Sequence, residues 1–289
     1  YRGAETYVHE LSTNLRKLGH DIKIVDSVFE LDSKAKIVIP IDGRLQAVMA
    51  RIWAWVHDAK VVISGQSGLG IDDKINLWTF PNCFIGLTNY QCAWAKKYNP
   101  FIKIVKIPNG VDLDKFNPTV KPIKINLPKP IVLSVGALET IKRQDLIIEQ
   151  IAQTRDSLLI VGKGSLEKEI YNLGIKMLGQ KRFKIMSFSH DEMPKVYTAC
   201  DRLIFKSEAW ESFGIAMVEA MASGLPVVAN DDPIRREIVG DAGLFIDPTN
   251  TDEYAKAIEK VLNTSWGDRP RRQAEKFDWD KIAEEYEKL

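Results

Sequence analysis

The sequence has few cysteines, almost no net charge and no long apolar run. Cys83, Cys92 and Cys200 are scattered without metal-ligand spacing, which favours a reducing cytoplasm over a disulfide framework. Lys+Arg total 40 and Asp+Glu total 39, so the basic excess of a general nucleic-acid binder is missing. The total charge does not exclude a local basic patch. No apolar run reaches the roughly 18 residues of a membrane span, and no signal peptide is visible. We therefore expect a cytoplasmic protein.

The apolar content is sufficient for two domains. In 289 residues, 45% are hydrophobic, which allows each of two domains its own core. Short β-branched runs separated by crossover-length segments predict parallel sheets in both halves of the chain. The expected strands are Ile37–Ile39, Val61–Ser64, Phe84–Leu87, Ile104–Ile107, Ile131–Gly136, Leu158–Val161, Phe183–Met186, Leu203–Phe205, Val227–Ala229 and Leu244–Ile246.

The first part of the chain predicts two helices and a further strand. A helix that begins at Gly3 ends at Gly19, and residues 21–25 then alternate as a strand. Residues 44–57 have apolar side chains at helical spacing, so we expect a helix packed on the sheet. An interfacial membrane helix is the less favoured alternative, because the polar face is not strongly basic. The apolar stripe consists of Leu45, Val48, Met49, Ile52, Trp55 and Val56.

Residues 208–228 predict a loop, a helix, a tight stop and a buried strand. Ser212 is the expected N-cap, and Gly224 suits the C′ position. Glu219 borders the apolar stripe of this helix without a cation four residues away, so its burial requires another hydrogen-bond donor. Glu211 lies beside backbone N–H groups that have no partner inside the helix, and such groups form a ready anion or phosphate site. Taken singly, Glu211 could also complement the helix macrodipole, and Glu219 could be a solvated edge residue.

Loops that suit ligands follow several strands. Gly136 ends one strand, and Lys142 and Arg143 precede the next helix, an arrangement that suits a diphosphate, although a solvated lysine is the commoner state. A glycine-rich loop at residues 65–73 follows another strand, at the edge where open α/β sheets bind ligands. His190 is expected to be a turn residue.

The stretch around Glu211 and Glu219 resembles the E-x7-E signature of retaining glycosyltransferases of the GT-B fold, glycosyltransferase family 4. Residues 108–112, Pro-Asn-Gly-Val-Asp, and the following Phe-x-Pro resemble the segment that closes the N-terminal domain of that family. Three positions depart from the family pattern. Arg2 stands where a glycine is usual, Gln66 where a histidine is frequent, and Ala137 where an arginine is usual.

The resemblance implies an α/β protein of the GT-B fold, with two Rossmann-like domains whose parallel sheets face each other across a cleft. Residues 1–118 would form the acceptor-side domain, lacking its first strand because the sequence begins at Tyr1 rather than Met. Residues 119–130 read as a proline-rich, semi-rigid linker. Residues 131–275 would bind the nucleotide-sugar, and residues 276–289 would form a helix that crosses back to the first domain.

The implied reaction moves a sugar, of the hexosyl class, from a nucleotide-diphosphate donor to an acceptor hydroxyl with retention, in carbohydrate biosynthesis. Glu219 would hold the ribose hydroxyls, and Glu211 would contact the donor sugar. Lys142 would stabilise the leaving diphosphate, so Glu211 and Lys142 are the catalytic candidates. The donor-binding candidates are Gly3, Gly136, Lys142, Arg143, Gly162, Ser189, Glu211, Phe213, Gly214, Ile215 and Glu219. The acceptor-side candidates are Gln66, Asp72, Asp73 and Asn109.

Partners and cofactors follow from the same reasoning. No residue cluster calls for a metal, so we expect the nucleotide-diphosphate sugar as co-substrate and no cofactor. The acceptor is an unknown sugar, lipid or small molecule, we expect no nucleic acid, and peripheral contact with the inner face of a membrane stays open. Another GT-B enzyme, such as a phosphorylase or a sugar-nucleotide epimerase, is an alternative. A non-catalytic sugar-nucleotide binder is a second one, motivated by Ala137 and Gln66.

Overall fold

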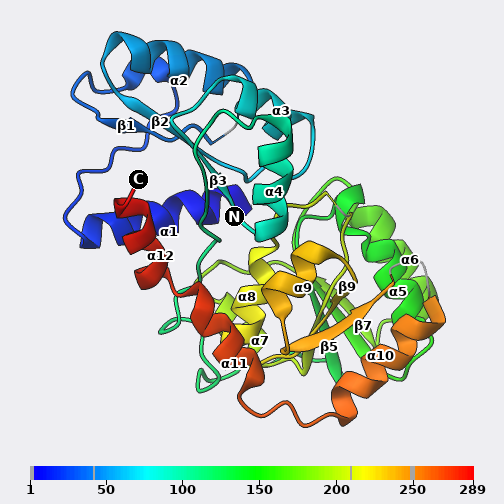
Figure 1. The fold of residues 1–289 in the computed structure, drawn as a ribbon. Coiled ribbons are helices and arrows are strands. Elements are labelled where there is room, and N and C mark those ends of the chain that lie inside the picture. Colours follow the sequence, from blue (N-terminus) through cyan, green and yellow to red (C-terminus); the bar gives the residue numbers. More distant parts are fainter. Residues whose placement is uncertain (1–2, 42, 209, 248–250) are drawn as a thin grey trace. The chain divides into compact units, whose positions relative to one another are not determined.

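The chain divides into two compact α/β units, each with its own sheet and core. The computed structural model describes residues 3–41, 43–208, 210–247 and 251–289. The six-stranded unit contains the described residues within Val111–Ala209 and Gly214–Asp278 (Figure 1). The four-stranded unit contains those within Gly3–Gly110, Trp210–Phe213 and Trp279–Leu289. The domain boundaries inferred from the sequence remain predictions.

The sheet of the six-stranded unit is parallel and doubly wound. Its order is β7-β6-β5-β8-β9-β10, so the chain builds outward from β5 in one direction and then returns to build in the other, as in a Rossmann sheet. The expected strands of this half are confirmed. Their bounds are β5 (Ile131–Val135), β6 (Ser157–Val161), β7 (Phe183–Met186), β8 (Arg202–Phe205), β9 (Val227–Asn230) and β10 (Gly243–Ile246).

Helices cover both faces of this sheet (Figure 1). The core on one face joins the strands to α5 (Gln144–Ala152), α6 (Glu167–Leu178) and α10 (Thr251–Asn263). On the other face α8 (Ile215–Ala222) contacts three neighbours, α7 (Met193–Tyr197), α9 (Pro233–Val239) and α11 (Arg269–Ala274). Helix α8 is therefore packed on several sides, and most of its side chains are buried, including Glu219.

The four-stranded unit has a parallel sheet in simple sequential order. Its strands are β1 (Ile37–Val38), β2 (Lys60–Ser64), β3 (Cys83–Gly86) and β4 (Ile104–Lys106). The crossovers are α2 (Leu45–Val56), α3 (Ile71–Trp78) and α4 (Asn89–Tyr98). Helix α1 (Gly3–Lys17) packs on the C-terminal helix α12 (Trp279–Glu287), where the buried hydroxyls of Tyr7 and Tyr286 are 2.9 Å apart. Short 3-10 helices span Val28–Glu30, Thr140–Lys142 and Glu275–Phe277.

One expectation about the first part of the chain is wrong, and the expected helix at residues 44–57 packs on the sheet through a different face. Residues 21–25 form no strand, and Ile24 is largely exposed, because the segment pairs with no described strand and buries too little apolar surface. Helix α2 forms, but its large apolar stripe is turned to solvent, and Trp55 is 67% exposed. The same helix carries a second apolar face of small residues, Ala47, Ala50 and Ala54, and this face is the buried one. Helical periodicity identifies apolar faces but not which of two turns inward.

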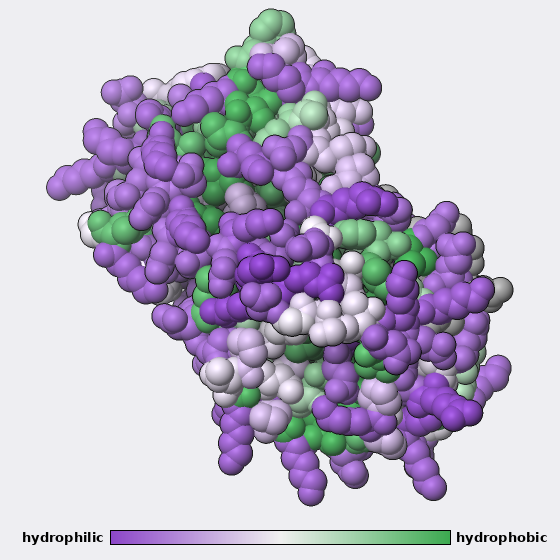
Figure 2. Space-filling view, turned by 60° about the horizontal axis from the view of Figure 1, so that its bottom comes forward, coloured by the Kyte–Doolittle hydropathy of each residue, from purple (hydrophilic) through white to green (hydrophobic). Residues whose placement is uncertain are grey.

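Exposed apolar side chains are concentrated in the four-stranded unit. Figure 2 shows one face of the molecule, where hydrophilic side chains cover most of the surface and hydrophobic ones gather in patches. About half of the large hydrophobic residues exposed in the described part of the chain lie on α2, on α3 or just after α3. A groove between these helices is lined by Val48, Arg51, Ile52, Trp55, Ile75, Trp78, Thr79 and Phe80. Such concentration is more than the scattered exposure of ordinary surfaces.

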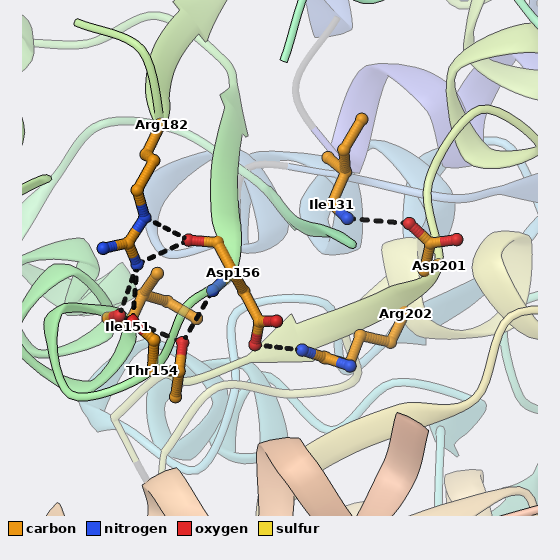
Figure 3. A network of polar contacts seen from close by, with 7 residues as sticks. All are labelled: Ile131, Ile151, Thr154, Asp156, Arg182, Asp201 and Arg202. Carbon is orange, nitrogen blue, oxygen red and sulfur yellow. Dashed lines mark hydrogen bonds and ion pairs between the residues drawn. The ribbon is translucent and has the colours of Figure 1, made fainter. Parts of the chain in front are cut away.

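Buried and half-buried polar groups hold the amino ends of four strands of the six-stranded sheet (Figure 3). Arg202 has no exposed surface, and its guanidinium forms an ion pair with Asp156. Arg182 donates to the backbone carbonyls of Thr154 and Asp156, both at 2.7 Å. Asp201 accepts from the backbone N–H of Ile131 at 2.7 Å. These contacts lie where β5, β6, β7 and β8 begin, opposite to the edge where the strands end.

We expect Asp156→Ala to lower the free energy of unfolding by about 3–5 kcal/mol, because it leaves the Arg202 guanidinium buried without its carboxylate. The surface pair of Lys129 with Asp201 supplies the control, since Lys129→Ala should cost less than about 1 kcal/mol. Urea unfolding followed by circular dichroism measures both. Equal midpoints for the two variants would show that the buried pair contributes no more than the exposed one.

Candidate functional site

The candidate site lies where the winding of the six-stranded sheet reverses, at the carboxyl ends of β5 and β8. Open α/β sheets bind ligands at such a switch point, because the two following loops diverge and leave a crevice. A backbone hydrogen bond joins the two loops, from the N–H of Glu208 to the carbonyl of Ile141 at 2.9 Å. The ammonium of Lys142 lies 5.1 Å from the ring centroid of Phe205, the last residue of β8.

Two predicted glycines meet at this edge. A Cβ on Gly162 would lie 1.9 Å from the carbonyl oxygen of Gly136, and a Cβ on Gly136 would lie 3.2 Å from Cε of Lys142. Only glycine fits at position 162, because the backbones approach too closely for a side chain. The backbones of the loops after β5 and β6 therefore lie close together, beside the Lys142 side chain. Such a close approach of glycine backbone suits a phosphate.

Arg143 lies between two carboxylates. Its guanidinium contacts Asp145 at 3.3 Å and Glu208 at 3.4 Å, and the hydrogen bond with Asp145 raises the pKa of Arg143. Arg143 also has a φ of 46° at the start of α5, in the left-handed region that a non-glycine residue adopts only when its surroundings hold it. Its expected role on the donor side remains a prediction.

Lys206 is a site residue that the sequence did not reveal. It directly follows β8 and is only 3% exposed. Burial, with a smaller contribution from the Arg143 charge, lowers the pKa of Lys206 to about 8. A lysine directly after a buried strand at the switch point was the available signal. Its proximity to Arg143 could not be inferred from spacing.

Helix α8 presents Glu219 from a buried face. The helix begins after Gly214, whose φ of 91° needs glycine, so the expected N-cap at Ser212 is wrong. The Ser212 hydroxyl instead donates to the carbonyl of Gln66 at 2.9 Å, inside the four-stranded unit. At the other end Gly224 has a φ of 87° and its N–H bonds to Met221, which confirms the predicted C′ glycine.

Glu219 has hydrogen bonds to both carboxylate oxygens. The Tyr197 hydroxyl donates to Oε2 at 2.7 Å, and Nε2 of His190 lies 3.1 Å from Oε1. Lys115 Nζ lies 3.1 Å from Nδ1 of His190. Because an ammonium only donates, Nδ1 accepts and Nε2 carries the hydrogen that Glu219 receives. Burial, followed by the Glu219 charge, raises the pKa of Tyr197 well above its usual range, which keeps the hydroxyl protonated as a donor. His190 does lie in a turn, but its contact with Glu219 was not foreseen.

The remaining donor-side candidates are distributed between the two units. Trp210–Phe213, which includes Glu211 and the buried Phe213, belongs to the four-stranded unit. Gly3 opens α1 in that same unit, and Arg2 lies outside the described residues. Ser189 belongs to the six-stranded unit, and its N–H and hydroxyl both donate to Glu192, at 2.9 and 2.7 Å. The structure therefore groups Gly136, Lys142, Gly162, Gly214 and Glu219 in one unit.

The acceptor-side candidates lie together in the four-stranded unit. The side-chain amides of Gln66 and Asn109 form a reciprocal pair, with hydrogen bonds of 2.7 and 3.0 Å. Asp72, in the first turn of α3, forms an ion pair with Arg44. Asp73 has no exposed surface, and its carboxylate accepts hydrogen bonds from Asn76 and Gln91. Of these side chains, Gln66 and Asp72 are partly accessible, whereas Asp73 and Asn109 are buried.

Within the part of the chain that the structure describes, no group of three or more His, Cys, Asp or Glu side chains could hold a metal ion. The same residues include no helix that is long and apolar enough to cross a membrane.

The architecture is that of the GT-B fold. Sucrose-phosphate synthase from Thermosynechococcus elongatus superposes with a TM-score of 0.71 at 22% identity, over 84% of this chain and 71% of that one. Anabaena HepE in complex with UDP superposes with a TM-score of 0.74 at 18% identity, over 96% of this chain and 80% of that one. At such identities the likeness concerns the fold alone, and the predicted fold class is confirmed.

Residues 116–277 match the model of the family Glycosyl transferases group 1, and the chain belongs to this family. O-antigen chain mannosyltransferase B of Escherichia coli is 30% identical over 150 residues, 50% of this chain and 36% of that protein. Sulfoquinovosyl transferase SQD2 of Arabidopsis thaliana is 25% identical over 190 residues, 59% of this chain and 36% of that protein. The chain thus spans about a third of the length of these two relatives.

We expect the stability of the protein to depend on the protonation of Asp73. Desolvation raises the pKa of Asp73 to about 7, so the folded state binds a proton that the unfolded chain releases near pH 4. The stability due to this group is therefore present below pH 4 and is lost as the pH rises towards 7. The difference in unfolding free energy between wild type and Asp73→Asn should change over this interval and level off above it. Urea unfolding at several pH values measures it, and a constant difference would contradict the assignment.

Proposed function

We propose that this chain carries the site of a retaining glycosyltransferase, which moves a hexosyl group from a nucleotide diphosphate to an acceptor hydroxyl. The observation that carries the proposal is the buried Glu219 carboxylate on α8, in the same unit as the glycine and lysine loop at the switch point. Membership of the family supplies the reaction class. The retaining course and the role of Glu211 rest on the resemblance of the E-x7-E stretch.

The donor-side groups fit the parts of a sugar nucleotide. Glu219 would accept hydrogen bonds from the ribose hydroxyls, because an ionised carboxylate offers lone pairs on both oxygens. Lys142 and the backbone N–H groups at the start of α8 would face the diphosphate, whose negative charge favours a helix N-terminus. Lys206 adds a buried lysine to this edge of the sheet.

In the proposed reaction the bond from the anomeric carbon to the diphosphate oxygen breaks, and the acceptor oxygen forms the new bond on the same face. The acceptor proton passes to the departing phosphate oxygen, so the step needs no side-chain base. Charge develops on the diphosphate, and preorganised cations and N–H dipoles stabilise it without reorganisation. Glu211 would hold the donor sugar during this exchange.

UDP-sugars are the first donors to test, because solved structures of the same fold contain UDP or UDP-glucose. Thermal shift with UDP-, GDP- and ADP-sugars ranks the donors, since a ligand that binds only the folded state raises its melting temperature. The absence of any shift would count against the donor site. We also propose that no metal ion takes part, so EDTA should leave turnover unchanged.

We expect Lys142→Ala and Glu211→Ala each to lower kcat/KM for sugar transfer or donor hydrolysis by about 10²–10³-fold, the usual effect of removing one preorganised contact to developing charge. Lys168→Ala and Glu169→Ala, on exposed positions of α6, are the matched controls and should retain wild-type rates.

Each alternative has its own outcome in that experiment. Unchanged turnover in both site variants would show that the site is assigned wrongly. Donor binding without transfer or hydrolysis would favour a non-catalytic sugar-nucleotide binder. Phosphorolysis or epimerisation of the donor would favour another GT-B enzyme.

We further propose that the exposed groove between α2 and α3 contacts a membrane surface. Helix α2 has an arginine and no acidic residue, and two tryptophans, Trp55 and Trp78, line the groove. Tryptophan side chains favour the interface between acyl chains and headgroups, and arginine favours anionic headgroups. Arg51 lies over the Trp55 ring, 5.0 Å from its centroid, so cation and aromatic ring share one edge.

We expect the protein to bind vesicles of phosphatidylcholine with phosphatidylglycerol, and to bind them less at high salt. The double variant Ile52→Ser/Trp55→Ser should reduce co-sedimentation several-fold. Tyr171→Ser/Met177→Ser, on the exposed face of α6 in the other unit, should not reduce it. Failure of the wild type to bind vesicles would contradict the proposal. A dimer in light scattering that only the first variant abolishes would assign the groove to a second copy of the chain.

A further inference from the structure

Both carboxylate oxygens of Glu219 accept hydrogen bonds from protein donors. Glu219 is 6% exposed, and separate donors occupy its two oxygens, the Tyr197 hydroxyl at 2.7 Å and the His190 ring at 3.1 Å. The donors come from the turn before α7 and from α7 itself, so they fix the carboxylate from one side. A carboxylate accepts about four hydrogen bonds, which leaves about one further acceptor position on each oxygen.

A second layer of contacts fixes His190. Lys115 contacts Nδ1 of the ring at 3.1 Å and the Asp191 carboxylate at 2.7 Å. The ring of Phe116 packs against both donors, with centroid distances of 5.5 Å to His190 and 5.9 Å to Tyr197. Lys115 therefore fixes the tautomer of His190, and Phe116 fixes the plane of the ring.

The segment that supplies Lys115 is itself joined to α8. The guanidinium of Arg271 donates to the carbonyl of Phe116 at 2.6 Å and to that of Ala222, the last residue of α8, at 2.9 Å. The helix that carries Glu219 and the segment that orients its partner are thus held by one side chain. Such a layered arrangement holds a functional group in one geometry before ligand arrives.

We propose that His190 is a positioning residue that orients Glu219 toward a vicinal diol, and so sets the preference for ribonucleoside over 2′-deoxyribonucleoside diphosphates. Two hydroxyls on neighbouring carbons match the remaining acceptor positions on the two oxygens. If the carboxylate turns, one of these hydrogen bonds is lost while the rest of the nucleotide still binds. This inference rests on the proposed function, which places the ribose at Glu219.

The experiment compares the affinities of UDP and 2′-deoxy-UDP by isothermal titration calorimetry, with the GDP and ADP pairs in parallel. The wild type should favour the ribose form by about 10-fold or more, the value of one hydrogen bond to a charged group. His190→Ala should bring the ratio close to one and change the affinity for the deoxy form by less than about two-fold, because only the bond to the 2′-hydroxyl is lost. His190→Gln, whose amide can replace Nε2 as a donor, should restore much of the preference.

Two further variants separate positioning from simple stability. Tyr197→Phe keeps the buried ring and removes only the donor to Oε2, so it should lower the ribose preference as well. Glu192→Ala removes two hydrogen bonds to Ser189 in the same turn without touching Glu219, so it should lower the melting temperature and leave the ratio unchanged. A merely structural role of His190 would make His190→Ala behave like Glu192→Ala.

The outcomes distinguish this inference from the proposed function. A wild-type ratio in His190→Ala, or equal weakening of both nucleotides, overturns the role of His190. If Glu219→Gln lowers the ratio and His190→Ala does not, only this inference fails. If the wild type shows no preference and Glu219→Gln has no effect, the ribose is not at Glu219, and the proposed donor site fails with it. Absence of binding by any of the diphosphates overturns both.

Discussion

The parallel pairing of β5 with β8 is the constraint on which the candidate site depends. Val132 pairs with Arg202 and Leu133 with Leu203, although some seventy residues of chain separate these strands. The pairing reverses the winding of the sheet and places the loop of Lys142 beside the loop that leads to α8. A parallel sheet puts all carboxyl ends at one edge, so each loop adds its polar groups to the same crevice. Without this pairing the glycines, lysines and Glu219 would belong to unrelated surfaces.

The two edges of this sheet use buried polar groups in different ways. At the amino edge, Asp156 forms an ion pair with Arg202, and Arg182 donates to the backbone carbonyls of Thr154 and Asp156, so these contacts hold the strand starts. At the carboxyl edge, Glu219 has two donors and further acceptor capacity, while Lys206 has a pKa lowered to about 8 by burial. Burial lowers the pKa of both Arg202 and Lys206, so what distinguishes the carboxyl edge is the acceptor capacity that Glu219 keeps for a ligand.

The four-stranded unit has paired polar side chains in its loops and exposed apolar side chains on its outer helices. Its loops pair the side chains of Gln66 and Asn109 and bury Asp73 beside Asn76, so these polar side chains bind one another. Its outer helices leave large apolar side chains in solvent while small alanines face the sheet. A helix with two apolar faces is stable only if the outer one is tolerated or covered, and the tryptophans and arginine of the groove favour a bilayer surface as its cover.

The sequence by itself determined the parallel α/β class and nearly every strand, because β-branched runs and glycine stops are local properties. The spacing of Glu211 and Glu219 carried the resemblance to the E-x7-E signature, and their roles remain a proposal. The sequence also indicated that a buried Glu219 would need a donor. Only the tertiary structure decided which donors those are, since His190 and Tyr197 reach Glu219 across more than twenty residues. The same limit explains the errors. Asp21–Val25 had strand alternation but no neighbouring strand, and α2 had two apolar faces. The Ser212 hydroxyl donates to the carbonyl of Gln66 and does not cap the N–H groups of α8. Hydrogen bonds and burial between distant segments settle such questions, and local pattern does not contain them.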